Sequence, residues 1–275
     1  MKKIYIVPNI VTSFSLAAGL FVIFKVNLSE PGMGTYKSLL ISTILILLAS
    51  FADWIDGAVA RIMHAESTFG IFLDSMADAV TFGVAPSVLV LKSLSLERGT
   101  ALSFFAVIGA MLFSICGILR LTRFTVKAMT PKKQTEPKIR HKHFVGLPIP
   151  AAALAVVGTN LLFAYPVFEQ WAGFSEELQT VLSTLVLIVL GYFMVSPFKF
   201  PSAKILHFQV PSFQLVFVAV VIAFFFLYGA LYFFPITLFT SAWLYICSGW
   251  TLVVIRLLVG KKSKTLADFE PENDD

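Results

Sequence analysis

Four aspartates within 26 residues of otherwise apolar sequence are the part of this chain best suited to chemistry. Asp53 and Asp56 are three residues apart, and Asp74 and Asp78 are four apart, so each pair shares one face of a helix. Each carboxylate in a membrane-spanning segment costs about 3 kcal/mol on insertion scales, so four of them need compensation. Oxygen-only ligands select Mg²⁺, Mn²⁺ or Ca²⁺ over Zn²⁺. Four aspartates could hold two such ions, as in two-metal phosphoryl displacement.

The residues around the aspartates fit a phosphate ligand. Gly57, Ala60 and Gly70 remove side-chain bulk beside the acids, and Arg61 adds a cation suited to a phosphate. Two other interpretations stay open from the residues alone. The acids could be ordinary helix-end residues with small residues for helix packing, or they could line the ion path of a divalent-cation transporter. A transporter would need polar residues through the full membrane depth, whereas these acids stop near one face.

The composition identifies the elements that must position the aspartates. Hydrophobic residues make up 57% of the 275 residues and charged residues only 13%, whereas a soluble domain carries about 25% charged residues. The sequence therefore predicts an all-α, polytopic transmembrane helical bundle. A spanning helix needs about 20 apolar residues. Eight runs meet this requirement, at about 8–26, 38–61, 69–93, 101–126, 146–166, 177–196, 211–234 and 236–258.

The short turn between the second and third runs makes these two helices antiparallel neighbours. All four carboxylates should then converge at the mouth of one helical hairpin. Seventeen of the 21 Lys and Arg residues lie at the termini and in the loops on the same side as this mouth. By the positive-inside rule we expect both termini and the active site on the cytosolic side of the cytoplasmic membrane. The net charge of +5 mostly records this bias, so we expect no nucleic-acid partner.

The aspartates and their neighbours also resemble a known signature. The order is Asp53, Asp56, Gly57, Ala60, Arg61, eight residues, Gly70, Asp74 and Asp78. This pattern resembles that of the CDP-alcohol phosphatidyltransferases in every fixed position and every gap. The resemblance implies a six-helix core, use of divalent metal, and transfer of a substituted phosphate from a CDP-linked donor to a hydroxyl with release of CMP. It also suggests a homodimer.

Further segments resemble one branch of that family, which uses CDP-diacylglycerol and L-serine and forms phosphatidylserine and CMP. The similar segments are 7–12, 73–86, 119–124, 144–153 and 194–202. The resemblance implies a membrane core at 1–205, to which 206–259 adds a transmembrane hairpin and 260–275 a charged cytosolic tail. Another alcohol acceptor or an archaeal-type lipid donor would be the alternative within the same chemistry.

The resemblance also implies roles for individual residues. Asp53, Asp56 and Asp74 would be the principal ligands of two Mg²⁺ or Mn²⁺ ions. Asp74 and Asp78 would be catalytic, with Asp78 the candidate general base that also touches a metal.

The donor and the acceptor need their own binding groups. The CDP moiety would be bordered by Asp53, Gly57, Ala60, Arg61 and Gly70. Arg120 and Arg123, three residues apart on one helix face, are candidates for the serine carboxylate or the donor phosphate, and the alternative is that they anchor the helix at the cytosolic interface. The acyl chains of the donor should leave sideways into the membrane lipids.

Overall fold

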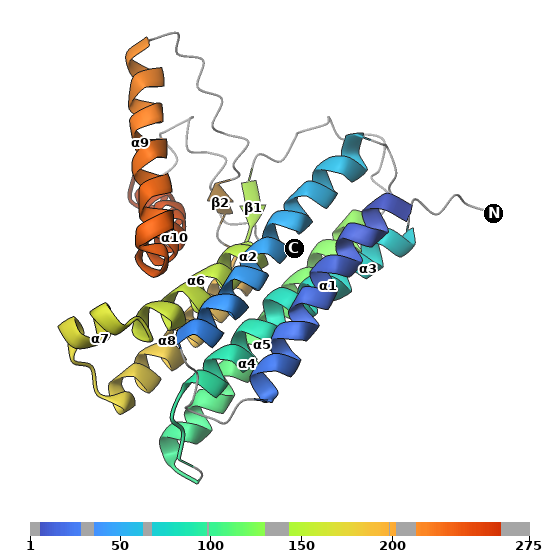
Figure 1. Cartoon of the computed structure of the whole chain (residues 1–275). Helices are drawn as coiled ribbons and strands as arrows, with labels where there is room; N and C mark the ends of the chain where they lie inside the picture. The colour runs from blue at the N-terminus through green and yellow to red at the C-terminus, as the bar shows by residue number, and fades with distance from the viewer. Residues whose placement is uncertain are drawn as a thin grey trace.

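The structure, a computed structural model, describes residues 6–28, 36–62, 68–97, 99–129, 143–197, 199–201 and 213–259. The predicted tail, 260–275, lies outside these residues. The elements in chain order are α1 (Ile6–Asn27), α2 (Tyr36–Ile62), α3 (Thr68–Asp78), the π-helical segment η1 (Ala79–Val84), α4 (Ala85–Ser93), α5 (Ala101–Met129), β1 (His143–Val145), α6 (Ile149–Phe163), α7 (Pro166–Ala172), α8 (Glu176–Val195), β2 (Lys199–Pro201), α9 (Phe213–Tyr232) and α10 (Phe234–Val259). Figure 1 shows their arrangement. The prediction of an all-α polytopic bundle is confirmed, and the two three-residue strands pair antiparallel beside it.

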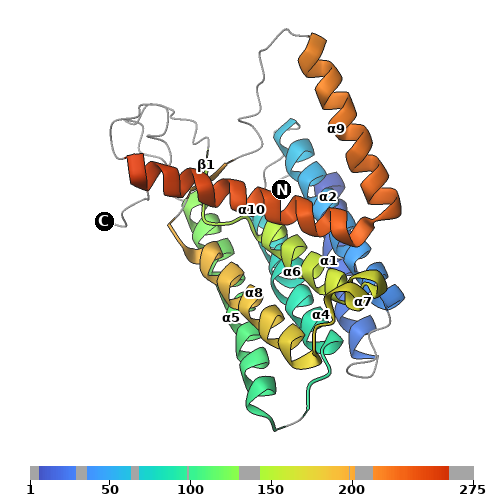
Figure 2. The same ribbon diagram turned by 90° about the vertical axis from the view of Figure 1, so that its left-hand side faces the viewer.

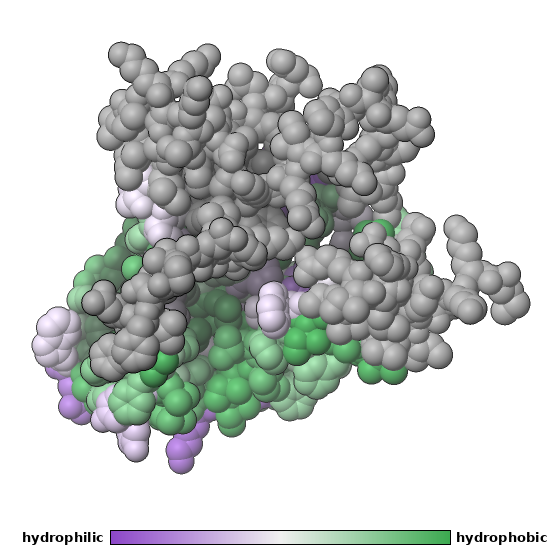
Figure 3. All heavy atoms as spheres, turned by 90° about the horizontal axis from the view of Figure 1, so that it is seen from above, coloured by the Kyte–Doolittle hydropathy of each residue, from purple (hydrophilic) through white to green (hydrophobic). Residues whose placement is uncertain are grey.

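Within the described residues, five stretches are long and apolar enough to cross a membrane: Asn9–Asn27, Tyr36–Gly57, Phe69–Ser93, Ala101–Val126 and Glu176–Val195. The third consists of α3, η1 and α4 in one run. Helices α6 and α7 would make a sixth span together, although the chain bends by 70° between them. Large apolar side chains lie exposed along these helices, and hydrophobic residues dominate the coloured surface in Figure 3. A surface of this kind belongs in lipid, so the chain is an integral membrane protein.

The bundle is built around α6. This helix is apolar on all sides and most of its residues are buried, which is typical of a helix enclosed by others. Pro148 and Pro150 flank its first residue, where a missing N–H costs nothing. Just before it, Gly146 has φ +77°, and a Cβ there would lie 2.4 Å from the carbonyl oxygen of Met194. Only glycine fits this turn, which ties the start of α6 to the end of α8.

The last two helices meet the bundle in different ways. The chain turns at Phe233, slightly before Pro235, the residue between the last two predicted runs, because proline is tolerated in the first turn of a helix. Helix α9 lies beside the bundle and contacts α10 (Figure 1). Helix α10 packs on α6 and crosses the direction of the bundle helices (Figure 2). Its direction differs from the antiparallel course that a simple hairpin predicts.

Close contact between α1 and η1 fixes the hairpin that carries the aspartates. A Cβ at Gly19 would lie 2.5 to 2.9 Å from atoms of Thr81, so only glycine lets the two backbones approach this closely. The Thr81 hydroxyl donates to the carbonyl of Ser15 at 3.0 Å. On the other side, the hydroxyls of Ser87 and Ser114 donate to the carbonyl of Gly83 at 3.1 and 3.0 Å. These bonds give the Gly83 carbonyl one side-chain donor from α4 and one from α5, which connects η1 to both helices.

Candidate active site

Three carboxylates from two helices meet at one point. Asp53 lies near the end of α2, Asp74 lies in the middle of α3, and Asp78 is the last residue of α3. One carboxylate oxygen from each lies within 4.8 Å of the other two, and all three side chains are partly buried. The spacing of four residues puts Asp74 and Asp78 on one face of α3, and Asp53 reaches them from α2. Helix α1 packs extensively on both α2 and α3, whereas α2 and α3 have few direct contacts, which differs from the predicted pair of neighbouring helices. The predicted convergence at the hairpin mouth is confirmed for these three residues.

Asp56 lies next to the three grouped aspartates and has a different environment. It is 6% exposed, and it lies within electrostatic reach of Asp53 and Asp74. Its Oδ2 accepts a hydrogen bond from the hydroxyl of Thr12 on α1. Its Oδ1 is buried and has no hydrogen-bond partner among the described residues. A buried carboxylate oxygen without a partner is costly, so this atom is suited to a ligand that carries positive charge.

The donor set fits a hard divalent cation. Three carboxylate oxygens point to a shared position, and a fourth buried carboxylate has a free oxygen beside them. Hard cations such as Mg²⁺ and Mn²⁺ prefer oxygen ligands of this kind. Without a cation, the mutual repulsion of four carboxylates would be uncompensated.

Arg120 supplies positive charge from a third helix. It lies on α5, where it is within electrostatic reach of Asp78 and of Tyr245 on α10. Its Nε is buried and has no hydrogen-bond partner among the described residues, so it can still donate to a ligand. Arg123 lies one turn further along α5 and is partly buried. Arg120 therefore lies near the aspartates, and the roles predicted for the two arginines stay predictions.

The small residues of the signature are placed only in part. Gly57 follows Asp56 in α2 and is exposed, and a Cβ there would meet nothing within 4 Å. This open space leaves room for a ligand beside the acids. Gly70 lies in α3, one turn before Asp74. The side chains of Ala60 and Arg61 lie outside the described part of the structure, so their predicted contacts with a donor stay predictions.

Sequence reasoning missed two residues beside the site. Thr12 falls in the segment 7–12 that resembles the family, but nothing in its spacing connects it with Asp56, 44 residues later. Tyr245 lies in the last helix, and a single tyrosine in an apolar run does not indicate a functional residue. Only the packing of the helices brings Thr12 to Asp56 and Tyr245 to Arg120.

The structure thus defines a membrane-embedded helical bundle with a carboxylate cluster suited to a divalent cation, an ion that enzymes use to displace phosphoryl groups. The model of the CDP-alcohol phosphatidyltransferase family matches residues 5–193, and the chain belongs to this family.

Curated relatives agree with this assignment. The chain is similar to the CDP-diacylglycerol–serine O-phosphatidyltransferase of Helicobacter pylori, with 30% identity over 216 residues that cover 78% of this chain and 80% of the relative. It is also similar to the proteins of the same name from Methanocaldococcus jannaschii, with 32% identity over 74% of this chain and 77% of the relative, and from Bacillus subtilis, with 32% identity over 72% and 91%.

Proposed function

We propose that this enzyme transfers the phosphatidyl group of CDP-diacylglycerol to the hydroxyl of L-serine and releases CMP. The observation that carries the proposal is the meeting of the Asp53, Asp74 and Asp78 carboxylates in a member of this family. The named activity of the relatives supports serine as the acceptor. In this reaction the serine oxygen forms a bond to the phosphorus that carries diacylglycerol, and the bond from that phosphorus to the CMP oxygen breaks.

The proposed roles are those that the resemblance implies, and the grouping of the carboxylates supports them. Asp78 accepts the proton of the serine hydroxyl at a carboxylate oxygen, because it lies at the end of α3 between the other acids and Arg120. Asp53, Asp56 and Asp74 hold one or two Mg²⁺ or Mn²⁺ ions. When bound, these ions supply positive charge to the phosphoryl oxygens and to the leaving CMP.

The two arginines hold the negative groups of the substrates. Arg120 keeps the phosphate or the serine carboxylate near Asp78 with the Nε donor that no described residue uses. Arg123, one turn away, binds the second of these groups. Gly57, Ala60, Arg61 and Gly70 border the CDP moiety, and the open space at Gly57 supports this placement.

Release of CMP is the direct test of the acceptor. Purified protein with CDP-diacylglycerol and Mg²⁺ or Mn²⁺ should release CMP when L-serine is added. A matched reaction with glycerol 3-phosphate in place of serine should release none. Release of CMP with glycerol 3-phosphate and not with serine would show that the enzyme uses another acceptor. A separate assay with donor analogues that carry ether-linked chains would detect a preference for an archaeal-type lipid donor.

Topology and assembly complete the proposal. Both termini and the aspartates face the cytosol across the cytoplasmic membrane, the membrane core 1–205 is followed by the added helices of 206–259, and two chains form a homodimer. The bias of Lys and Arg supports the orientation. A reporter that fluoresces only in the cytosol, fused after residue 275, tests the orientation. Light scattering of the detergent complex tests the dimer.

A further inference from the structure

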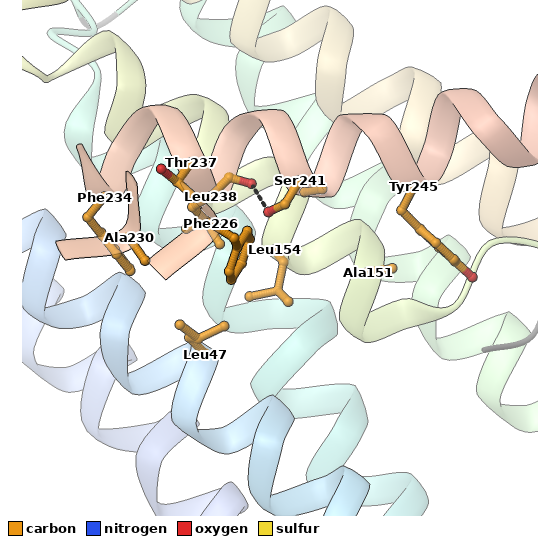
Figure 4. Close-up of a pocket in the computed structure, with 11 residues that line it drawn as sticks. Leu47, Ala151, Leu154, Phe226, Ala230, Phe234, Thr237, Leu238, Ser241 and Tyr245 are labelled. Atoms are coloured by element: carbon orange, nitrogen blue, oxygen red, sulfur yellow. Dashed lines mark hydrogen bonds between the residues drawn. The ribbon is translucent and has the colours of Figure 1, made fainter. Parts of the chain in front are cut away.

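An apolar groove lies under the last helix. Its volume is about 350 Å³, and its walls come from α2, α6, α9 and α10. Leu47 and Leu154 form its floor, and Phe226 and Ala230 close it on the side of α9 (Figure 4). The α9 and α10 walls lie beyond residue 193, where the match to the family model ends.

One stripe of α10 lines the groove over about three helical turns. Positions three and four apart face it from Phe234 to Tyr245, and these ends are about 16 Å apart at roughly 1.5 Å per residue. The stripe consists of Phe234, Thr237, Leu238, Ser241, Ala242 and Tyr245. This shape fits an extended chain better than a compact ligand.

The groove requires no polar partner along most of its length. The hydroxyl of Thr237 donates to the carbonyl of Phe233 at 3.1 Å, and that of Ser241 donates to the carbonyl of Leu238 at 3.0 Å. The second of these bonds is drawn in Figure 4. Both hydroxyls are therefore satisfied within α10, and the surface they present to the groove behaves as apolar. The chemistry that fits this lining is a hydrocarbon chain.

Tyr245, at one end of the groove, lies near a residue of the candidate site. Tyr245 lies within electrostatic reach of Arg120, and Arg120 within reach of Asp78. A molecule with a charged head at the aspartates and an apolar tail would place its tail beside Tyr245 and along α10. Polar groups thus follow one another from the tyrosine to the acids, and apolar ones extend from the tyrosine to Phe234.

We propose that this groove binds one acyl chain of the lipid donor. The inference rests on the proposed function, because it takes the donor head to be bound at the aspartates. Helices α9 and α10, beyond the family core, then determine which acyl-chain length fits. The enzyme prefers donors whose chain fills the groove.

Filling the groove from α9 provides the test, because α9 contacts little of the bundle and tolerates substitution. Ala230→Trp places a large ring in the groove. Leu231→Trp, on the neighbouring position that is 71% exposed, is the matched control. A second filling variant, Ala242→Phe, fills the groove from α10, so that a distortion of α9 alone cannot explain the result. Each variant is assayed for CMP release with a dioleoyl and with a dioctanoyl donor.

We expect Ala230→Trp, which lies by the Phe234 end of the groove, to lower kcat/KM for the dioleoyl donor at least tenfold and for the dioctanoyl donor less than twofold. Ala242→Phe, one turn from Tyr245, should lower kcat/KM for both donors. The basis is that each methylene kept out of an apolar site costs about 0.8 kcal/mol, close to a fourfold change. The control should behave as the parent with both donors. Equal losses with the two donors in Ala230→Trp, or no loss in either filling variant, would overturn the proposal.

A binding experiment separates this inference from the proposed function. A donor with a photoreactive group near the end of one acyl chain should label residues between Phe226 and Tyr245 when irradiated with the full-length protein in nanodiscs. CMP release with serine but no label in this segment would reject the acyl groove alone. Labelling that ordinary phosphatidylglycerol abolishes at equal concentration would show a general bilayer-lipid site and reject the donor assignment. Labelling without any CMP release would support the groove and reject the serine reaction.

Discussion

The hydroxyl of Thr12 on α1 donates a buried hydrogen bond to Oδ2 of Asp56 on α2. It connects a helix without acidic residues to the helix that carries half of the aspartate cluster. Because the other oxygen of Asp56 has no partner among the described residues, this one bond fixes the orientation of the carboxylate. Thr12 is therefore a positioning residue for the site.

Thr12→Val should remove this bond while keeping the side-chain shape. A hydrogen bond to a charged group contributes about 1.5–3 kcal/mol, so we expect kcat/KM for the donor to fall about 10- to 100-fold. The apparent affinity for Mn²⁺ should fall as well, because the Asp56 carboxylate would rotate freely. Thr12→Ser keeps the hydroxyl and should restore most of both values. Parent-like metal dependence in Thr12→Val would show that the bond is only structural.

Asp78→Asn should abolish turnover by at least 1,000-fold if Asp78 is the base, because an amide does not accept the serine proton; general bases typically contribute about 10²–10⁴-fold. Donor binding, measured by isothermal titration with CDP-diacylglycerol, should persist. Glu97→Gln, an exposed acid far from the aspartates, is the matched control and should leave turnover unchanged. Substantial turnover in Asp78→Asn would move the base role to another group.

Chelation with EDTA should stop CMP release, and Mg²⁺ or Mn²⁺ should restore it, because the site offers only carboxylate oxygens. Asp53→Asn and Asp74→Asn should each raise the metal concentration required for half-maximal activity. Restoration by Zn²⁺ at the same concentration, or unchanged activity in EDTA, would contradict a hard-cation site.

Gly57→Ala should separate activity from stability. No atom lies within 4 Å of the added Cβ, and alanine is a better helix former than glycine by about 1 kcal/mol. The melting temperature should therefore stay the same or rise by a few degrees. The KM for the donor should rise several-fold, because the methyl occupies the space proposed for the CDP moiety. An unchanged KM would remove Gly57 from the donor site.

Gly19→Ala should behave in the opposite way. Its Cβ would lie 2.7 Å from the Cα of Thr81, which is backbone and cannot rotate away. Helix α1 must shift from η1, at a cost of about 1–3 kcal/mol typical of overpacking. We expect a lower melting temperature in detergent, and a loss of activity that follows the loss of fold. Thermal stability equal to the parent would show that α1 adapts without cost.

Much of the fold could be predicted because the bilayer imposes simple rules on the sequence. The apolar runs and the charge bias predict the spanning helices, and the spacing of Asp53, Asp74 and Asp78 predicts that they meet. The bend between α6 and α7 and the course of α10 could not be predicted, since hydropathy records only how apolar a run is. It carries no information about the direction in which a helix leaves a turn.

The sequence by itself determined the chemistry of this protein: carboxylates at helical spacing, few other charges, and enough apolar residues to place them in lipid. The tertiary structure decided which groups complete the site, since Thr12 and Tyr245 come from helices whose sequences show no connection with the aspartates. The physical reason is that spacing within one helix is fixed by the backbone, whereas contacts between helices depend on side-chain packing. At Gly19 and Gly146 that packing allows no larger residue.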